Sequence, residues 1–156
     1  MPRTLIPTLL LALASACAAP AQATTTLPAI DPTPVPPPPA WLPEVDAMYP
    51  QLRVPGLERV DFEPESWWRA ATPLLNRKAG FRVEDIGRSA EGRPLRHIRW
   101  GKGRTTVLLW SQMHGDESTG TMALADLFTF LGQHPQHPLV QRLRANTTLH
   151  VLPLLN

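Results

Sequence analysis

The sequence predicts an α/β fold in which a mixed central sheet is flanked by helices. Over the last hundred or so residues, short apolar strand patterns alternate with amphipathic helix patterns, which is typical of a layered sheet. The prolines separate this part from the front of the chain, because 13 of the 19 prolines lie among the first 55 residues. The chain of 156 residues therefore predicts one folded domain preceded by a segment that does not pack.

Residues 1–23 are typical of an export signal peptide. Arg3 supplies a positive charge, an apolar run too short to span a bilayer follows, and Ala21-Gln22-Ala23 is a small-residue cleavage site. A second interpretation ends the signal at Cys17, because the residues before it resemble a bacterial lipobox, with Ala14 where that motif usually has Leu. Both interpretations predict a periplasmic or extracellular protein, and the second adds a lipid anchor at Cys17.

Residues 24–56 are predicted to be a proline-rich linker. Within them, residues 31–40 read DPTPVPPPPA. Proline lacks a backbone N–H and fixes φ, so this run favours polyproline II over a helix or an inner strand. We expect a semi-rigid spacer between the signal and a folded domain over residues 57–156.

The folded part is predicted to begin with a helix and a hairpin. Apolar residues recur at helical spacing over 64–75. Residues 81–87 and 95–100 have strand patterns, and Ser89-Ala90-Glu91-Gly92 between them predicts a hairpin connection in which Gly92 can take a positive φ.

The remaining elements alternate between strand and helix. Residues 105–111 are apolar without polar alternation, which predicts a strand in the middle of a sheet that is covered on both faces. An amphipathic helix over 118–131, a short helix over 138–145 and a buried strand over 148–155 follow. Because nothing follows the last strand to cover it, we expect the domain to be incomplete at its C-terminus.

The segment between the apolar strand and the amphipathic helix contains the residues best suited to chemistry. His114 and Glu117 lie three positions apart, with Gly115 between them allowing a sharp bend. An imidazole nitrogen and a carboxylate oxygen suit Zn²⁺, and ligands of α/β sheets bind at the carboxyl ends of strands. The simpler interpretation is a pair of ordinary polar side chains near a helix N-terminus.

Three sequence blocks, in this order, resemble the start of the zinc carboxypeptidases, the carboxypeptidase A-like metallopeptidases. They are IGRSAEGRPL at 86–95, VLLWSQMHGDE at 107–117 and HVLPLLN at 150–156. The resemblance covers residues 57–156 and implies a fold of the zinc-peptidase type, Zn²⁺ as cofactor, and His114 and Glu117 as two of three zinc ligands. It also implies that the third ligand, the catalytic Glu and the residues that hold the substrate carboxylate come later than Asn156. No catalytic or substrate-binding residue is therefore assigned.

The resemblance implies an exported zinc metallocarboxypeptidase that hydrolyses C-terminal residues from peptides. We expect the 156-residue chain to be an inactive fragment of it. Two alternatives stay open. One is an aspartoacylase-type zinc deacylase or amidase, which shares the H-x-x-E motif on a similar core. The other is a non-catalytic exported binding domain.

The other histidines and the net charge are less informative. His150 can be considered as a third ligand, although a His in an inner strand is more often a hydrogen-bonded core residue. His134 and His137 are expected to face solvent, and His97 to be a surface or packing residue. The formal charge of +2 is too small to indicate a nucleic-acid partner.

Overall fold

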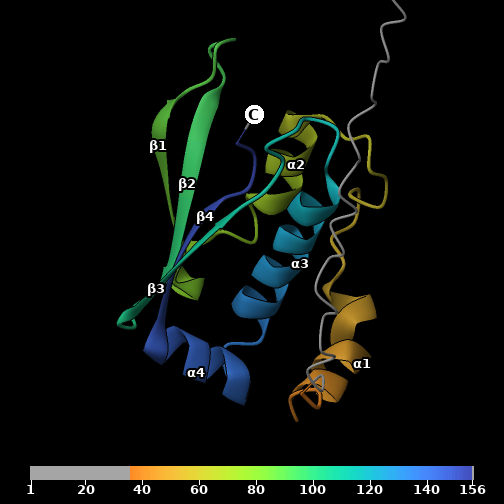
Figure 1. The fold of residues 1–156 in the computed structure, drawn as a ribbon, viewed down its shortest axis with the longest axis vertical. Helices are drawn as coiled ribbons and strands as arrows, with labels where there is room; N and C mark the ends of the chain where they lie inside the picture. The colour runs from red at the N-terminus through yellow and green to blue at the C-terminus, as the bar shows by residue number, and fades with distance from the viewer. Residues whose placement is uncertain (1–35, 156) are drawn as a thin grey trace, which may run out of the picture. The chain divides into compact units, whose positions relative to one another are not determined.

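A four-stranded mixed sheet organises the structure, a computed structural model that describes residues 36–155 (Figure 1). The strands lie in the order β1-β2-β4-β3, with β1 and β4 antiparallel to β2, and β3 parallel to β4. Their bounds are β1 Arg82–Arg88, β2 Pro94–Gly101, β3 Thr105–Trp110 and β4 Thr147–Leu152. The predicted mixed sheet is confirmed. The predicted signal and the Cys17 anchor lie outside the described residues.

Helices α2 and α3 lie against one face of this sheet (Figure 1). The helices are α1 Leu42–Leu52, α2 Pro64–Ala71, the 3₁₀ helix η1 Arg77–Ala79, α3 Thr119–Gln133 and α4 Pro138–Asn146. The α2 helix ends four residues before the predicted boundary at Leu75, because Pro73 cannot supply a helical N–H. None of the helices within residues 36–155 is long and apolar enough to cross a bilayer.

The core lies between the sheet and helices α2 and α3. Its largest fully buried side chains come from both layers, and they include Trp67, Trp100, Phe81, Phe128, Ile98, Leu131 and Val151. Phe128 of α3 is central, because its ring packs edge-to-face on Phe81 at a centroid distance of 5.5 Å and on Trp67 at 6.3 Å. Such arrangements add to the stabilisation from burial alone.

The linker prediction is wrong for the part of residues 24–56 that forms α1. Leu52 and Val54 are buried in the core, at 3% and 8% exposure. The Asp126 carboxylate of α3 accepts hydrogen bonds from the Val54 backbone N–H at 3.1 Å and from the Tyr49 hydroxyl at 3.3 Å. This segment is therefore part of the folded domain.

The sequence of α1 has an amphipathic helical pattern despite its prolines. Val45, Met48 and Leu52 recur at spacings of three and four residues and pack against the core. Pro43 lies in the first turn of the helix, where a missing N–H costs nothing. The high proline content of residues 24–56 predicts a linker and masks this helical pattern.

Strand β3 is at the edge of the described sheet, and the expectation of a central strand is wrong for residues 36–155. Strand β4 takes the central place, because the crossover through α3 and α4 brings it between β2 and β3. Alternate side chains of β3 therefore differ: Val107 and Leu109 pack against the core, whereas Leu108 and Trp110 are each 53% exposed.

The hairpin prediction is confirmed. Gly92 has a φ of +78° in the β1–β2 connection, a conformation that glycine adopts without a Cβ penalty.

Gly103, between β2 and β3, is packed so tightly that a side chain does not fit. A Cβ there would lie 1.7 Å from the Asn146 carbonyl carbon and 2.0 Å from the Thr147 nitrogen. We expect Gly103→Ala to lower the free energy of unfolding by about 3 kcal/mol, because the backbone at the α4–β4 junction must move. Denaturant unfolding checks this. Gly87→Ala is the control, since its nearest contact would be 3.9 Å away, and an equal loss in both variants would contradict the explanation.

Candidate metal centre

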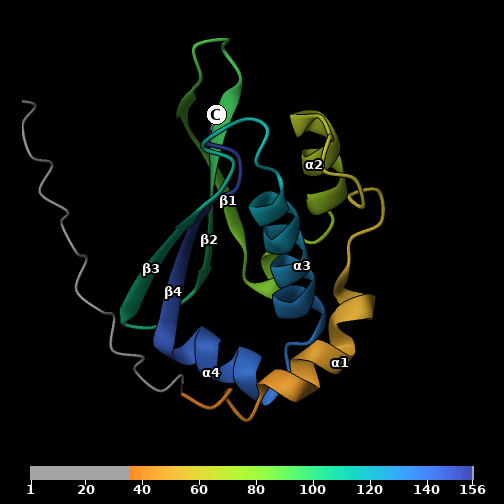
Figure 2. The ribbon, with the colours of Figure 1, turned by 45° about the vertical axis from the view of Figure 1, so that its right-hand side comes forward.

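The β3–α3 loop, residues 111–118, begins at the carboxyl end of β3 and runs beside the end of the described chain (Figure 2). The Ser111 backbone N–H donates to the Leu152 carbonyl at 3.1 Å, and the Leu155 N–H donates to the Ser111 carbonyl at 3.3 Å. These bonds extend the β3–β4 pairing past the last residue of each strand. The start of the loop is therefore fixed by backbone hydrogen bonds.

A buried polar cluster ties this loop to the first turn of α3. The Ser111 hydroxyl donates to the Pro153 carbonyl at 2.6 Å, and the Thr121 hydroxyl donates to the same oxygen at 3.1 Å. The Trp67 indole N–H donates to the Thr121 carbonyl at 2.9 Å. At Gly120, an added Cβ would lie 3.3 Å from the Ser111 Cβ, so strand end and helix start are in close contact.

Gln112 shapes the turn that follows. Its backbone has a φ of +49°, the one non-glycine residue with a positive φ among residues 36–155, and its side chain is buried. The Gln112 side-chain N–H donates to the Gly115 carbonyl at 2.8 Å, and the Glu117 backbone N–H donates to the His114 carbonyl at 3.1 Å. Non-glycine residues held in this sparsely populated conformation cluster at functional sites.

Ser118 holds the C-terminal end of the loop in place. Its side chain is buried, and its hydroxyl donates to the Val60 carbonyl, so it does not cap α3 through its side chain. The residues at both ends of the turn, Gln112 and Ser118, are thus buried and hydrogen-bonded, while the residues between them face solvent.

His114 and Glu117 meet on this turn. The His114 Nδ1 lies 3.1 Å from a Glu117 carboxylate oxygen, and the two side chains are 68% and 67% exposed. An imidazole nitrogen and a carboxylate oxygen at one exposed point are suitable donors for zinc. The pair therefore fits as two ligands of a metal ion. Within the part of the chain that the structure describes, no third His, Cys, Asp or Glu joins them to make a group of three.

His150 is engaged elsewhere. Its Nδ1 lies 2.9 Å from the Nε2 of His97, and the two rings stack at a centroid distance of 5.0 Å. Both residues lie on neighbouring strands, β4 and β2, so the pair is a cross-strand contact. The interpretation of His150 as a hydrogen-bonded strand residue is favoured over that of a ligand beside His114.

The expectation that His137 faces solvent is wrong. Its side chain is 8% exposed and lies 3.3 Å from the Glu44 carboxylate of α1. The His137 Nδ1 accepts from the Leu139 backbone N–H at 3.1 Å and so caps α4. Pro138 indicates this capping role in the sequence, because a proline at the first helical position makes residue 137 the N-cap. His134 is half-buried against the Phe130 ring.

The His97–His150 pair predicts a pH-dependent stability. Burial, followed by the charge of His150, lowers the pKa of His97 below its ordinary value of 6.5, whereas Glu84 acts in the opposite direction. As the pH falls below about 6.5, the unfolded chain takes up this proton before the folded chain does, so the free energy of unfolding decreases.

Denaturant midpoints at several pH values between about 7.5 and 5 test this prediction. We expect His97→Gln to lose less stability over this range than the parent chain. His134→Gln, outside the pair, is the control and should keep the dependence of the parent. Identical pH profiles for the parent chain and His97→Gln would contradict the assignment.

A family model of known proteins matches about half of the chain. The sequence model described as zinc carboxypeptidase matches residues 74–156, which include the candidate site. No curated protein sequence shows a significant match.

Several solved metallo-carboxypeptidase structures have a similar fold. One from Burkholderia cenocepacia has a TM-score of 0.53 at 20% identity, over 61% of this chain and 27% of that one. One from Pseudomonas aeruginosa, in complex with (2-guanidinoethylmercapto)succinic acid, has a TM-score of 0.50 at 25% identity, over 61% and 26%. A putative carboxypeptidase A from Shewanella denitrificans has a TM-score of 0.53 at 15% identity, over 59% and 25%. The chain thus spans about a quarter of the length of each of these structures.

Proposed function

The chain belongs to the zinc carboxypeptidase family, and from this premise we propose that the complete protein is an exported enzyme that hydrolyses the C-terminal residues of peptides. We propose His114 and Glu117 as two of its zinc ligands. The observation that carries the proposal is the meeting of an imidazole nitrogen and a carboxylate oxygen, 3.1 Å apart, on an exposed turn at the carboxyl end of β3. The export part rests on the sequence of residues 1–23 alone.

The residues around the pair support such a role. When bound, zinc supplies Lewis-acid chemistry that polarises a carbonyl and makes a water molecule more acidic. In its neutral form, His114 offers the lone pair of Nδ1, and Glu117 offers a carboxylate beside it. Gln112 and Ser118 hold the ends of the turn, so its backbone has little conformational freedom to lose on metal binding. The exposure of both side chains leaves the turn open to a peptide.

The complete gene product, assayed on two kinds of substrate, tests the proposal. We expect release of the C-terminal amino acid from an N-blocked dipeptide, its loss on treatment with a chelator and its return on addition of Zn²⁺. Preferential hydrolysis of N-acyl amino acids would instead indicate the aspartoacylase-type deacylase. No turnover of either substrate by the zinc-loaded protein would favour a non-catalytic binding domain.

A further inference from the structure

A hollow of about 720 Å³ lies where the β1–β2 hairpin meets η1, and its charge is unbalanced. Four cationic side chains line it, and they are Arg77, Arg82, Arg99 and Lys102. Glu84 is the one carboxylate in the lining. We propose that this basic hollow, defined by these four cationic residues, binds a phosphate-type anion.

Two of the cations face each other directly across the hairpin. Arg82 and Arg99 are register partners in the β1–β2 ladder, so their side chains leave the same face of the sheet. Like charges in this arrangement repel each other and destabilise the pairing of the strands. An anion placed between them would remove the repulsion.

Two other arginines of the hairpin form ion pairs with carboxylates. Arg96 pairs with Asp85 at 3.4 Å, and Arg93 pairs with Glu91 at 2.8 Å. Among the ion pairs within residues 36–155, none involves a cationic residue of the basic hollow. The hairpin therefore pairs Arg93 and Arg96 with carboxylates and leaves the cationic residues of the hollow without a salt bridge.

A further cation approaches the hollow from α4. Gly80, which lines the hollow, has a φ of +92°, and a Cβ there would lie 2.9 Å from a terminal nitrogen of the Arg144 guanidinium. The Lys102 backbone N–H donates to the Arg144 carbonyl at 3.1 Å, so the two residues are held together. Cationic residues from η1, the hairpin and α4 thus lie at or beside the hollow, although these elements are distant in sequence.

This composition suits phosphate groups. The planar guanidinium offers paired N–H donors that match phosphate oxygens, and several arginines favour a multivalent anion over a single carboxylate. A soluble phosphate compound and the headgroup of an anionic phospholipid share this chemistry.

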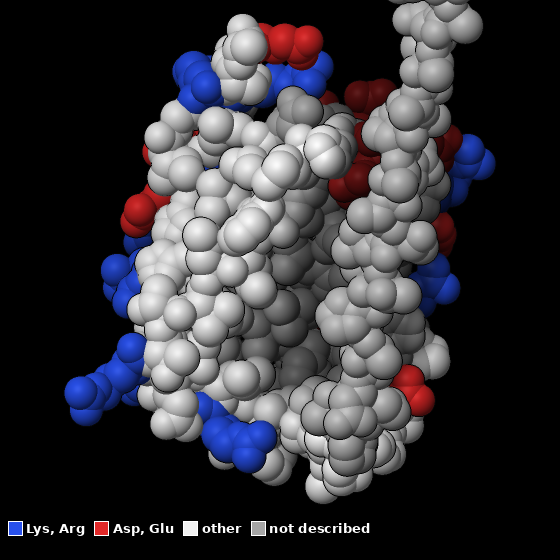
Figure 3. All heavy atoms as spheres, viewed as in Figure 1, with Lys and Arg blue, Asp and Glu red and all other residues white. Residues whose placement is uncertain are grey.

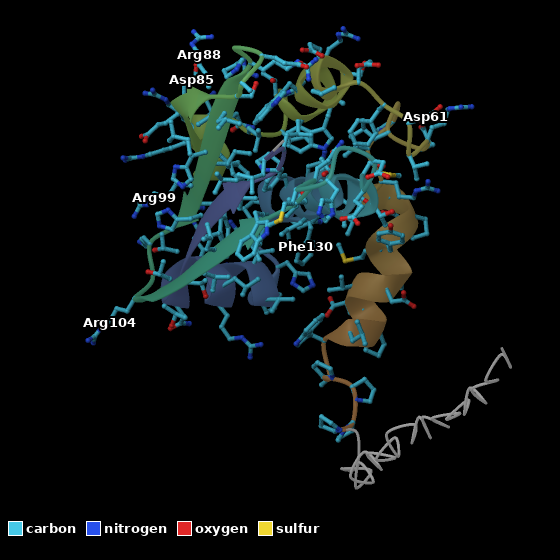
Figure 4. The ribbon with its side chains drawn as sticks, turned by 45° about the horizontal axis from the view of Figure 1, so that its top comes forward. Asp61, Asp85, Arg88, Arg99, Arg104 and Phe130 are labelled. Carbon is cyan, nitrogen blue, oxygen red and sulfur yellow. The ribbon has the colours of Figure 1, made fainter. Side chains whose placement is uncertain are left out.

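Arg99 lies on the sheet well away from Arg88 and Arg104, which sit at opposite ends of the strands (Figure 4). Lys and Arg side chains also border the strand side of the face in Figure 3, while its middle is free of them.

Calorimetric titration of the 156-residue chain with pyrophosphate at low salt tests the basic hollow. We expect saturable binding that the double variant Arg82→Gln/Arg99→Gln weakens at least tenfold. The control Arg88→Gln/Arg104→Gln removes the same charge elsewhere and should change the affinity less than twofold. Pyrophosphate should raise the Tm of the parent chain and of the control, but not of the Arg82→Gln/Arg99→Gln variant, which should be folded without it.

Vesicles distinguish the two sources of phosphate. Binding to phosphatidylglycerol vesicles but not to phosphatidylcholine vesicles, lost in the Arg82→Gln/Arg99→Gln variant, would identify a lipid headgroup even if pyrophosphate binds poorly. Pyrophosphate binding without vesicle binding would identify a soluble phosphate compound. Equal weakening in both double variants would show a diffuse charge attraction and overturn the proposal, as would the absence of binding to either probe.

Discussion

Replacing His114 by Ala in the complete gene product is expected to lower kcat/KM for C-terminal hydrolysis at least about 10³-fold, which corresponds to about 4 kcal/mol of transition-state stabilisation. The reason is that one of the proposed zinc ligands is lost, and the Lewis-acid contribution of a metal to such a reaction amounts to several kcal/mol. Glu117→Gln should show a loss of similar size, because a neutral amide is a poorer ligand than a carboxylate. Both variants should unfold at the temperature of the parent without zinc, since both side chains are about two-thirds exposed.

The matched control is His134→Ala, which removes an imidazole at the other end of α3. It should keep the activity of the parent. If His114→Ala retained more than a tenth of the parental kcat/KM in the presence of zinc, the assignment of His114 as a ligand would be wrong.

Replacing Trp67 by Ala should have the largest effect on stability, a loss of about 3–5 kcal/mol in the free energy of unfolding. The Trp67 side chain is completely buried, and it packs against both Trp68 and Phe128. Its removal leaves a cavity between α2 and α3, and it leaves the Thr121 carbonyl without its indole donor. Such a loss is a large fraction of the total stability of an ordinary domain.

Trp68 provides the control for this prediction, because it is adjacent and chemically identical but half-buried. The Arg96 guanidinium carbon lies over the Trp68 ring, 4.8 Å from its centroid. We expect Trp68→Ala to cost about 1–2 kcal/mol, from partial burial and the loss of a cation–π contact. Equal losses in the two variants, measured by denaturant unfolding, would show that α2 does not pack as described.

Local patterns predicted most of the elements and the position of the His114–Glu117 pair in the fold. Apolar runs located β3 and β4, and Gly92 located the hairpin turn, because each depends on a few neighbouring residues. His114 and Glu117 were placed correctly at the end of a strand for the same reason. That they bind zinc is our proposal, because donor atoms at one point are a condition for a metal site.

The errors arose where distant residues decide the outcome. Helix α1 is held by Asp126, 77 positions after Tyr49, and no local pattern reports this contact. His137 is buried because Phe130 and Glu44 surround it, again through tertiary packing. The edge position of β3 follows from the crossover that places β4 beside β2, which the apolar character of β3 alone does not reveal.

The proposed zinc site is tested most directly by nuclear magnetic resonance of the histidine rings during titration of the 156-residue chain with Zn²⁺. The five histidines of the sequence serve as internal probes. The expected result is a shift of the His114 ring signals that saturates, that weakens at least tenfold in Glu117→Gln, and that leaves the rings of His97 and His150 unchanged. Saturating shifts confined to the His97–His150 pair, with His114 unaffected, would contradict the assignment of His114 and Glu117 as zinc ligands.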